Sequence, residues 1–212
     1  MERVYANRTE AGRLLGAAVR ARLGEQPAVV LGLPRGGVPV AVGVAAALGA
    51  TVDVLVVRKV GVPSQPELAM GAVGPGGVTI RNAEVLDLLP DAARRFESVA
   101  AGERDEVSRR ERLFRGERPP LDLKDRTVVL VDDGVATGAT LRAAVAAARK
   151  LGAGRVVVAV PVASHEAIAL LSAEADEVIC LEQPAYFMAV GQFYDDFPQV
   201  SDSEVRAILA GQ

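Results

Sequence analysis

Five short apolar runs, separated along most of the chain by helical patterns, limit the fold more than any other feature of the sequence. The runs occupy residues 28–33, 51–57, 126–131, 155–162 and 176–181. Most positions in each run are apolar, as in strands that are buried on both faces. Strands of this kind that alternate with helices predict an α/β protein with a parallel sheet covered by helices on both sides.

The segments around these runs carry the start and stop signals of helices. Apolar residues recur at helical spacing from Leu14 to Leu23, Thr9 is a suitable N-cap, and Gly24 ends the pattern. Further helices are expected over residues 38–49, with Pro39 in the first turn, over residues 139–151, and after Ser164. A capping box formed by Ser201 and Glu204 predicts a last short helix.

Two glycine-rich loops follow two of the expected strands. Residues 32–37 read GLPRGG, and residues 134–140 read GVATGAT. In a parallel sheet, ligands bind beyond the carboxyl ends of the strands, at the point where strand order reverses. Both loops are therefore expected at a ligand site.

Two neighbouring aspartates, Asp132 and Asp133, come directly before the second loop. Two carboxylates repel each other, and burying one without a partner is costly, so the pair needs a cation or the hydroxyl donors of a vicinal diol. The small residues that follow can close their backbone amides around an anion. The hydroxyls of Thr137 and Thr140 and the N-terminus of the next helix would assist them. Together, these two features predict a site for a sugar phosphate.

Two familiar nucleotide-binding motifs are absent from these loops. A Walker loop requires lysine after its last glycine, but Ala139 follows Gly138. The dinucleotide fingerprint G-x-G-x-x-G does not fit GLPRGG. Neither nucleotide-binding fold is supported.

The stretch VVLVDDGVATGAT, residues 128–140, resembles the signature of the type I phosphoribosyltransferases. Two further segments, LGLPRGGVPVA and VVRKVGVP, are similar to the pyrophosphate loop of that family and to a strand end that carries basic residues. The order and spacing agree over about residues 28–181. The resemblance implies a five-stranded parallel sheet, a flexible loop over the active site and a small hood that binds the acceptor. Family members transfer the phosphoribosyl group of phosphoribosyl diphosphate to a nitrogenous base and release diphosphate, with Mg²⁺ present.

The resemblance also implies roles for individual residues. Asp132 and Asp133 would hydrogen-bond the 2- and 3-hydroxyls of the ribose, directly or through Mg²⁺, and would act in catalysis together with Arg58 and Lys59. The predicted 5-phosphate site consists of Ala136, Thr137, Gly138, Ala139 and Thr140. The predicted diphosphate site consists of Arg35, Gly36, Gly37, Arg58 and Lys59. Because this loop often carries a non-proline cis peptide in the family, one is expected by position between Arg35 and Gly36.

The acceptor base is not identified by the sequence. Members that act on 6-oxopurines usually carry an acidic residue where this chain has Ala136, which argues against that chemistry. Glu67 is a candidate for assisting the base. The hood is expected at about residues 182–200, where Tyr186 and Phe187 could stack on a base. Alternatively, the aromatic residues there anchor an irregular segment to the core.

Residues 61–125 interrupt the alternation of strands and helices. Their first half predicts a mobile hairpin with two short extended pieces around residues 74–77. Their second half predicts a charged helix with a narrow apolar stripe: Phe96, Ala100, Val107 and Phe114. Such a helix is expected to lie solvated on the core, and the alternatives are a subunit contact or a lid. Since many relatives are dimers, a homodimer would be compatible with the resemblance.

Composition restricts the remaining classes of protein. A chain of 212 residues can form a single domain, and a net charge of −3 with a pI of about 5.4 gives no support for general nucleic-acid binding. The apolar stretches are too short to span a bilayer, so no membrane partner and a cytoplasmic location are expected. Cys180 is expected to be a small buried hydrophobe, and His165 is expected in the first turn of a surface helix.

Three functions are compatible with these observations. The first is a phosphoribosyltransferase that acts on a purine- or pyrimidine-type base in nucleotide salvage. The second is a regulatory protein that senses phosphoribosyl diphosphate without turnover, and the third is a hydrolase that acts on a sugar phosphate. Arg35, Arg58 and Lys59, which would serve the departure of diphosphate, favour the enzyme.

Overall fold

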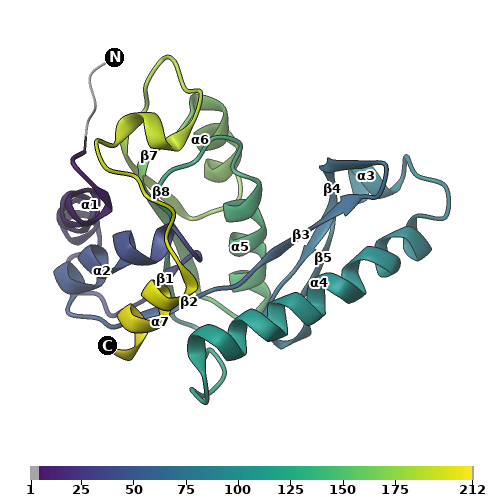
Figure 1. Ribbon diagram of the computed structural model, residues 1–212, viewed down its shortest axis with the longest axis horizontal. Helices are drawn as coiled ribbons and strands as arrows, with labels where there is room; N and C mark the ends of the chain where they lie inside the picture. Colours follow the sequence, from purple (N-terminus) through teal and green to yellow (C-terminus); the bar gives the residue numbers. More distant parts are fainter. Residues whose placement is uncertain (1–4, 212) are drawn as a thin grey trace.

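A parallel sheet forms the centre of the protein. The computed structural model describes residues 5–211, apart from the side chains of Pro66 and Glu67. The sheet has five strands in the order β2-β1-β6-β7-β8 (Figure 1). Their bounds are Ala28–Gly32 (β1), Val52–Val54 (β2), Thr127–Val131 (β6), Arg155–Val162 (β7) and Glu177–Glu182 (β8). The α/β fold and the five-stranded parallel sheet expected from the sequence are confirmed.

The order of the strands reverses between β1 and β6. β1 pairs with β2 on one side and with β6 on the other, so that Gly32 lies opposite both Val54 and Val131. The chain moves outward from β1 to β2, and it later returns at β6 to build the other half of the sheet. Both glycine-rich loops therefore leave the sheet at this switch point.

Helices cover both faces of the sheet. α1 (Arg8–Leu23) and α2 (Gly37–Leu48) lie on one face, and α5 (Ala139–Lys150) and α6 (His165–Ser172) lie on the other. Alternate residues of β6 serve the two layers, because Val129 and Val131 pack toward α1 and α2 while Val128 and Leu130 pack toward α5 and α6. The C-terminal helix α7 (Asp202–Ala210) packs beside α2.

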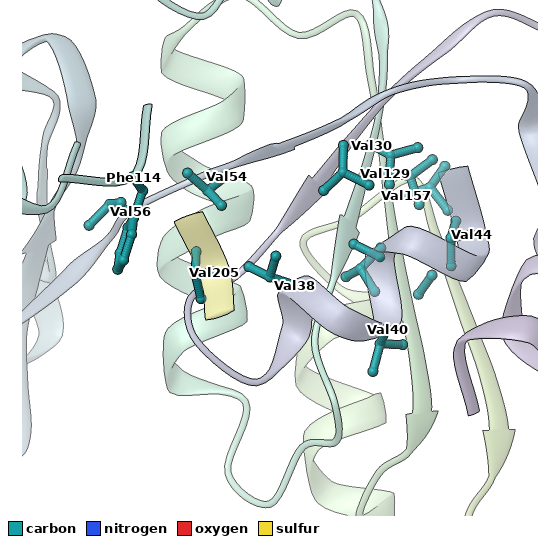
Figure 2. Close-up of a cluster of buried hydrophobic side chains, with 14 of the residues drawn as sticks. Val30, Val38, Val40, Val44, Val54, Val56, Phe114, Val129, Val157 and Val205 are labelled. Atoms are coloured by element: carbon teal, nitrogen blue, oxygen red, sulfur yellow. The ribbon is translucent and has the colours of Figure 1, made fainter. Parts of the chain in front are cut away.

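The core beneath α2 consists mostly of valines. Figure 2 shows Val30, Val129 and Val157, from three neighbouring strands, close to Val44 of α2. These side chains are inaccessible to solvent. At the other end of the same cluster, Phe114 lies next to Val56. The core thus continues from the parallel sheet to the residues that were expected to form an insertion.

The first helix begins two residues earlier than the sequence suggested. Asn7, and not Thr9, is the N-cap, because its side chain accepts a hydrogen bond from the backbone N–H of Glu10 at 3.0 Å. Thr9 belongs to the first turn of α1. The shift also places Arg8 in that turn. At the other end of the chain, Ser201 and Glu204 form the expected capping box.

The interrupting region contains a second sheet. Its antiparallel strands are β3 (Arg58–Val62), β4 (Gln65–Val73) and β5 (Thr79–Arg81), and the 3-10 turn η1 (Pro75–Gly77) joins the last two. The expected turn at residues 74–77 is present, but the chain forms three strands where the sequence predicted two extended pieces. β3 is the additional strand, and it begins at Arg58, before the predicted boundary at residue 61. Only Val60 and Val62 of β3 are buried, so its sequence carries a weak apolar signal, and β3 is a strand because it pairs with β4.

Two helices complete this region: α3 (Ala83–Leu86) and α4 (Ala92–Arg115). The four residues of the predicted apolar stripe of α4, and no others of that helix, are buried. α4 packs on β3 and β4 and reaches α7 with its C-terminal end (Figure 1). There Arg115 donates to both carboxylate oxygens of Asp53 in β2, at 3.0 and 3.1 Å, which ties α4 to the parallel sheet.

None of the helices in the described part of the chain is both long and apolar enough to cross a bilayer.

Candidate active site

Two loops meet at the switch point of the sheet and place the aspartate pair against two glycines. A Cβ atom added to Gly36 would overlap Oδ2 of Asp133, and one added to Gly37 would overlap the carbonyl oxygen of Val131. The backbone N–H of Leu33 donates to that same oxygen at 2.9 Å. The carboxylate of Asp133 thus lies against the backbone of the first loop, an approach that only glycine at position 36 permits.

A non-proline cis peptide is present in the first loop, but one residue earlier than expected. It joins Pro34 and Arg35, and the expectation of Arg35–Gly36 was wrong. Gly36 already has helical dihedral angles, with φ −62° and ψ −33°, as it leads into α2. The peptide before it therefore belongs to the entry of the helix, and the cis bond lies in the turn that precedes it.

The carboxylates of Asp132 and Asp133 lie in a recess with little solvent. Oδ1 of Asp132 accepts a hydrogen bond from the backbone N–H of Asp133 at 2.9 Å. Burial raises the pKa of Asp132 well above its usual range, and the neighbouring charge of Asp133 adds to this effect. Burial also raises the pKa of Asp133, although the guanidinium of Arg8 opposes that shift. Negative charge at this place is costly without a ligand, as the sequence suggested.

Arg8 is a site residue that the sequence did not reveal. Its Nε donates to Oδ2 of Asp133 at 2.8 Å, with only 10% and 14% of the two side chains exposed. Its Nη1 donates to the carbonyl of Pro198 at 2.8 Å, and its Cζ lies 3.7 Å from the ring centroid of Phe197. Counting backbone and side chain together, 9% of Arg8 is exposed, the smallest fraction for any charged residue in the described part of the chain. It therefore connects the aspartate pair to the segment expected to form the hood.

The second loop leads from β6 into α5. Gly138 has a left-handed conformation, with φ 78°, and is the N-cap of α5. Ser164 fixes the loop from the neighbouring connection, because its hydroxyl donates to the carbonyl of Ala136 at 2.6 Å. Ala136, Thr137, Ala139 and Thr140 are exposed around the start of the helix. The amides of a first helical turn have no partners within the helix, so this loop can bind an anion.

The basic residues predicted for the diphosphate do not share one cavity. Arg35 and Gly36 line a cavity of about 490 Å³ together with Arg8, Asp133 and residues 197–200. Nη1 of Arg35 lies 3.7 Å from Oδ1 of Asp202, at the start of α7. Arg58 and Lys59 line a second cavity, of about 470 Å³, next to Leu33 and Pro34. The loop after β1 lies between the two cavities. Arg35 is therefore on one side of this loop, and Arg58 and Lys59 are on the other.

The expected hood, residues 182–200, has both an anchored part and an exposed part. Phe193 and Tyr194 are buried against Tyr5, and the hydroxyl of Tyr194 donates to the carbonyl of Asp133 at 2.6 Å. Burial raises the pKa of Tyr194, which keeps the hydroxyl protonated as a donor. The ring of Phe187 lies 5.1 Å from that of Phe193, whereas Tyr186 is 79% exposed. Some of the aromatic residues thus anchor the segment, and Tyr186 remains available to a ligand.

Three other residues singled out in the sequence lie away from this recess or cannot be placed. His165 is exposed in the first turn of α6, after the N-cap Ser164, as expected. Cys180 is half-buried, and burial raises the pKa of its thiol to about 11, which suits a packing residue rather than a nucleophile. Glu67 belongs to β4, but its side chain lies outside the described residues.

Comparison with known proteins identifies the family. The model of the phosphoribosyl transferase domain family matches residues 2–197. A crystal structure of TT1426 from Thermus thermophilus shares 48% identity, superposes with a TM-score of 0.90 and is matched over 98% of both chains. Two proteins of Mycobacterium tuberculosis, named "Putative phosphoribosyl transferase MT0597" (strain CDC 1551 / Oshkosh) and "Putative phosphoribosyl transferase Rv0571c" (strain ATCC 25618 / H37Rv), are each 48% identical over 207 residues.

The match to the curated relatives covers 98% of this chain but 46% of theirs, so the chain spans about half the length of those proteins. The family model, in contrast, covers nearly the whole chain. The fold and the family are those expected from the strand, aspartate and loop pattern. The chain belongs to the phosphoribosyl transferase domain family.

Proposed function

We propose that the protein transfers the 5-phosphoribosyl group of phosphoribosyl diphosphate to a nitrogenous base of the purine or pyrimidine type and releases diphosphate. The observation that carries the proposal is the meeting of the Asp132–Asp133 pair with the Gly36–Gly37 turn, next to the loop that leads into α5 and can bind phosphate. A diol needs hydrogen-bond acceptors, a phosphate needs N–H donors, and a leaving diphosphate needs cations. The aspartate pair, the loop before α5 and the basic residues beside the first loop would serve these three groups, and all of them border the switch point of this sheet.

The carboxylates would act on the ribose. Asp133 is oriented by Arg8, and both aspartates lie against the backbone of the Gly36–Gly37 turn. The two carboxylates would accept hydrogen bonds from the 2- and 3-hydroxyls of the ribose. Each charge-assisted hydrogen bond of this kind contributes about 1.5–3 kcal/mol. As diphosphate leaves, the anomeric carbon gains positive character. Fixed negative groups beside it therefore stabilise the transition state more than the ground state.

The phosphate groups would be held at the ends of the ribose. Residues 136–140 would bind the 5-phosphate with the amides at the start of α5 and the hydroxyls of Thr137 and Thr140. Arg35 and the Arg58–Lys59 pair would neutralise the diphosphate from the two sides of the first loop. Arginine suits this role because its planar group binds phosphate oxygens in pairs.

Magnesium fits this set of donors as a substrate-bound ion. Among residues 5–211, no cluster of three or more side chains of the types His, Cys, Asp and Glu could hold a metal by itself. Mg²⁺ is commonly bound by one or two carboxylates together with substrate oxygens, and Asp132 and Asp133 provide two carboxylates. Bound with the substrate, the ion would offset the negative charge of the diphosphate. The two aspartates would meet it through the ribose hydroxyls or water.

The acceptor would bind on the hood side of the aspartate pair. The cavity there is lined by Arg8, Arg35 and Asp133 and is bordered by Phe197 and Val190. Ala136 lacks the carboxylate that 6-oxopurine chemistry uses at its position, so a different base is proposed. Tyr186 and Phe187 remain the proposed stacking residues, and Glu67 remains a candidate for assisting the base.

Diphosphate release tests the proposal. The protein is incubated with phosphoribosyl diphosphate, Mg²⁺ and a panel of purine, pyrimidine and other nitrogenous bases, and diphosphate is measured over time. Release that requires one of the bases is expected. Tight binding without release for any base would instead indicate a sensor, and release without a base would indicate a hydrolase.

A further inference from the structure

The second cavity beside the first loop has a cationic lining, and α4 contributes residues to it that the predicted site did not include. Its volume is about 470 Å³, and it lies between β3, α4, the loop after β1 and the start of α5. The charged residues that line it are three cations and one carboxylate: Arg58, Lys59, Arg110 and Glu103. Two of these four, Glu103 and Arg110, come from α4. The excess of positive charge suits an anion with more than one charge.

α4 directs Glu103 and Arg110 to the same side. The two residues are seven positions apart, which is two helical turns, and Val99 lines the cavity one turn before them. The buried stripe beside them holds the helix against β3 and β4, and the bidentate contact of Arg115 with Asp53 holds its end. The two side chains are therefore presented to the cavity from a fixed support.

Glu103 forms an ion pair with Arg58, one of the cations that line the cavity. Its Oε2 lies 2.7 Å from Nε of Arg58, with 24% and 39% of the two side chains exposed. Arg110 donates from Nε to Oε1 of Glu106 at 2.7 Å. A guanidinium has five N–H donors, so this one bond does not exhaust it. Arg109 donates to Oε2 of the same Glu106, also at 2.7 Å, but it is not part of the cavity lining.

We propose that α4 forms one wall of the diphosphate pocket. In this pocket Arg110 binds the diphosphate of phosphoribosyl diphosphate, and Glu103 pairs with Arg58 at the position that this anion would take. The inference rests on the proposed function and extends it to a helix outside the family signature. It assigns α4 a role in binding substrate, in place of a solvated helix on the core. Arg110 thereby joins Arg58 and Lys59 on one side of the loop, opposite Arg35.

Calorimetric titration with inorganic diphosphate and Mg²⁺ tests the role of each side chain. Arg110→Met should weaken binding about tenfold or more, because a charge-assisted hydrogen bond is lost. Glu103→Gln should tighten binding, because it removes the competing carboxylate from Arg58. Arg109→Met is the matched control, since it removes the neighbouring arginine of the same ion pair and should leave the affinity within about twofold. Unfolding temperatures of all variants verify that each one is folded.

Two results would overturn the inference. One is an equal effect of Arg110→Met and Arg109→Met, and the other is weaker binding by Glu103→Gln. Arg58→Met separates this failure from failure of the proposed function. If the wild-type protein binds diphosphate and only Arg58→Met weakens it, the pocket stands without α4. If the wild-type protein binds neither diphosphate nor phosphoribosyl diphosphate, both the proposed function and this inference are wrong.

Discussion

Replacing Arg8 by methionine should destabilise the protein through the aspartate pair. Removing one partner of a buried ion pair costs about 3–5 kcal/mol, since the other charge is left buried without compensation. Arg8 and Asp133 retain 10% and 14% exposure, and water can reach them in part, so we expect a loss near the lower limit, about 3 kcal/mol. For a chain of this length, that corresponds to a fall in Tm of roughly 6–12 °C.

A double-mutant cycle with Asp133→Asn isolates the contact. Asp133→Asn alone should cost less than Arg8→Met, because Arg8 keeps the carbonyl of Pro198 and the ring of Phe197. In the double variant the orphaned carboxylate is absent, and the coupling free energy should reach about 2 kcal/mol in denaturant unfolding. Arg13→Met, an exposed residue of the same helix, is the control and should change stability by less than about 0.5 kcal/mol. Additive effects of the two single substitutions would refute the assigned role of Arg8.

Two further predictions concern the recess itself. Burial raises the folded-state pKa of Asp132, so ionisation weakens the fold as the pH rises through that pKa. Asp132→Asn should therefore raise the free energy of unfolding at pH 7.5 and lose this advantage as the pH falls toward about 4, the usual pKa of an unfolded aspartate. A pH-independent gain in urea unfolding would contradict the reasoning. Gly36→Ala should displace the carboxylate of Asp133 from Arg8 and lower both turnover and stability. Gly37→Ala should lower stability because its Cβ meets the backbone of Val131. Thermal unfolding and diphosphate release measured on both variants check these effects, and an unchanged unfolding temperature in either variant would contradict them.

The sequence predicted the elements whose signal is local. The five parallel strands lie in mostly apolar runs, the apolar stripe of α4 recurs at helical spacing, and the Ser201 capping box depends on four consecutive residues. The two loops were placed correctly because strand order reverses where both leave the sheet. In each case a short stretch of chain determines its own conformation or its position in the layer.

Features that depend on distant partners were missed. β3 carries two basic residues and becomes a strand through its pairing with β4. Arg8 is one of four arginines in α1, and it is distinguished only by a contact with Asp133, 125 positions away. The separation of Arg35 from the Arg58–Lys59 pair by the first loop likewise follows from tertiary packing. The motif therefore identified the family, while the residues that orient and surround the motif could be found only from the fold.

A crystal structure of the protein with phosphoribosyl diphosphate and Mg²⁺ tests the central claim most directly. The account predicts the ribose hydroxyls within hydrogen-bonding distance of Asp132 and Asp133 and the 5-phosphate at residues 136–140. The diphosphate is predicted beside the loop after β1. Binding of the ligand elsewhere, for example in the groove of about 650 Å³ between α5 and the small sheet, would contradict it.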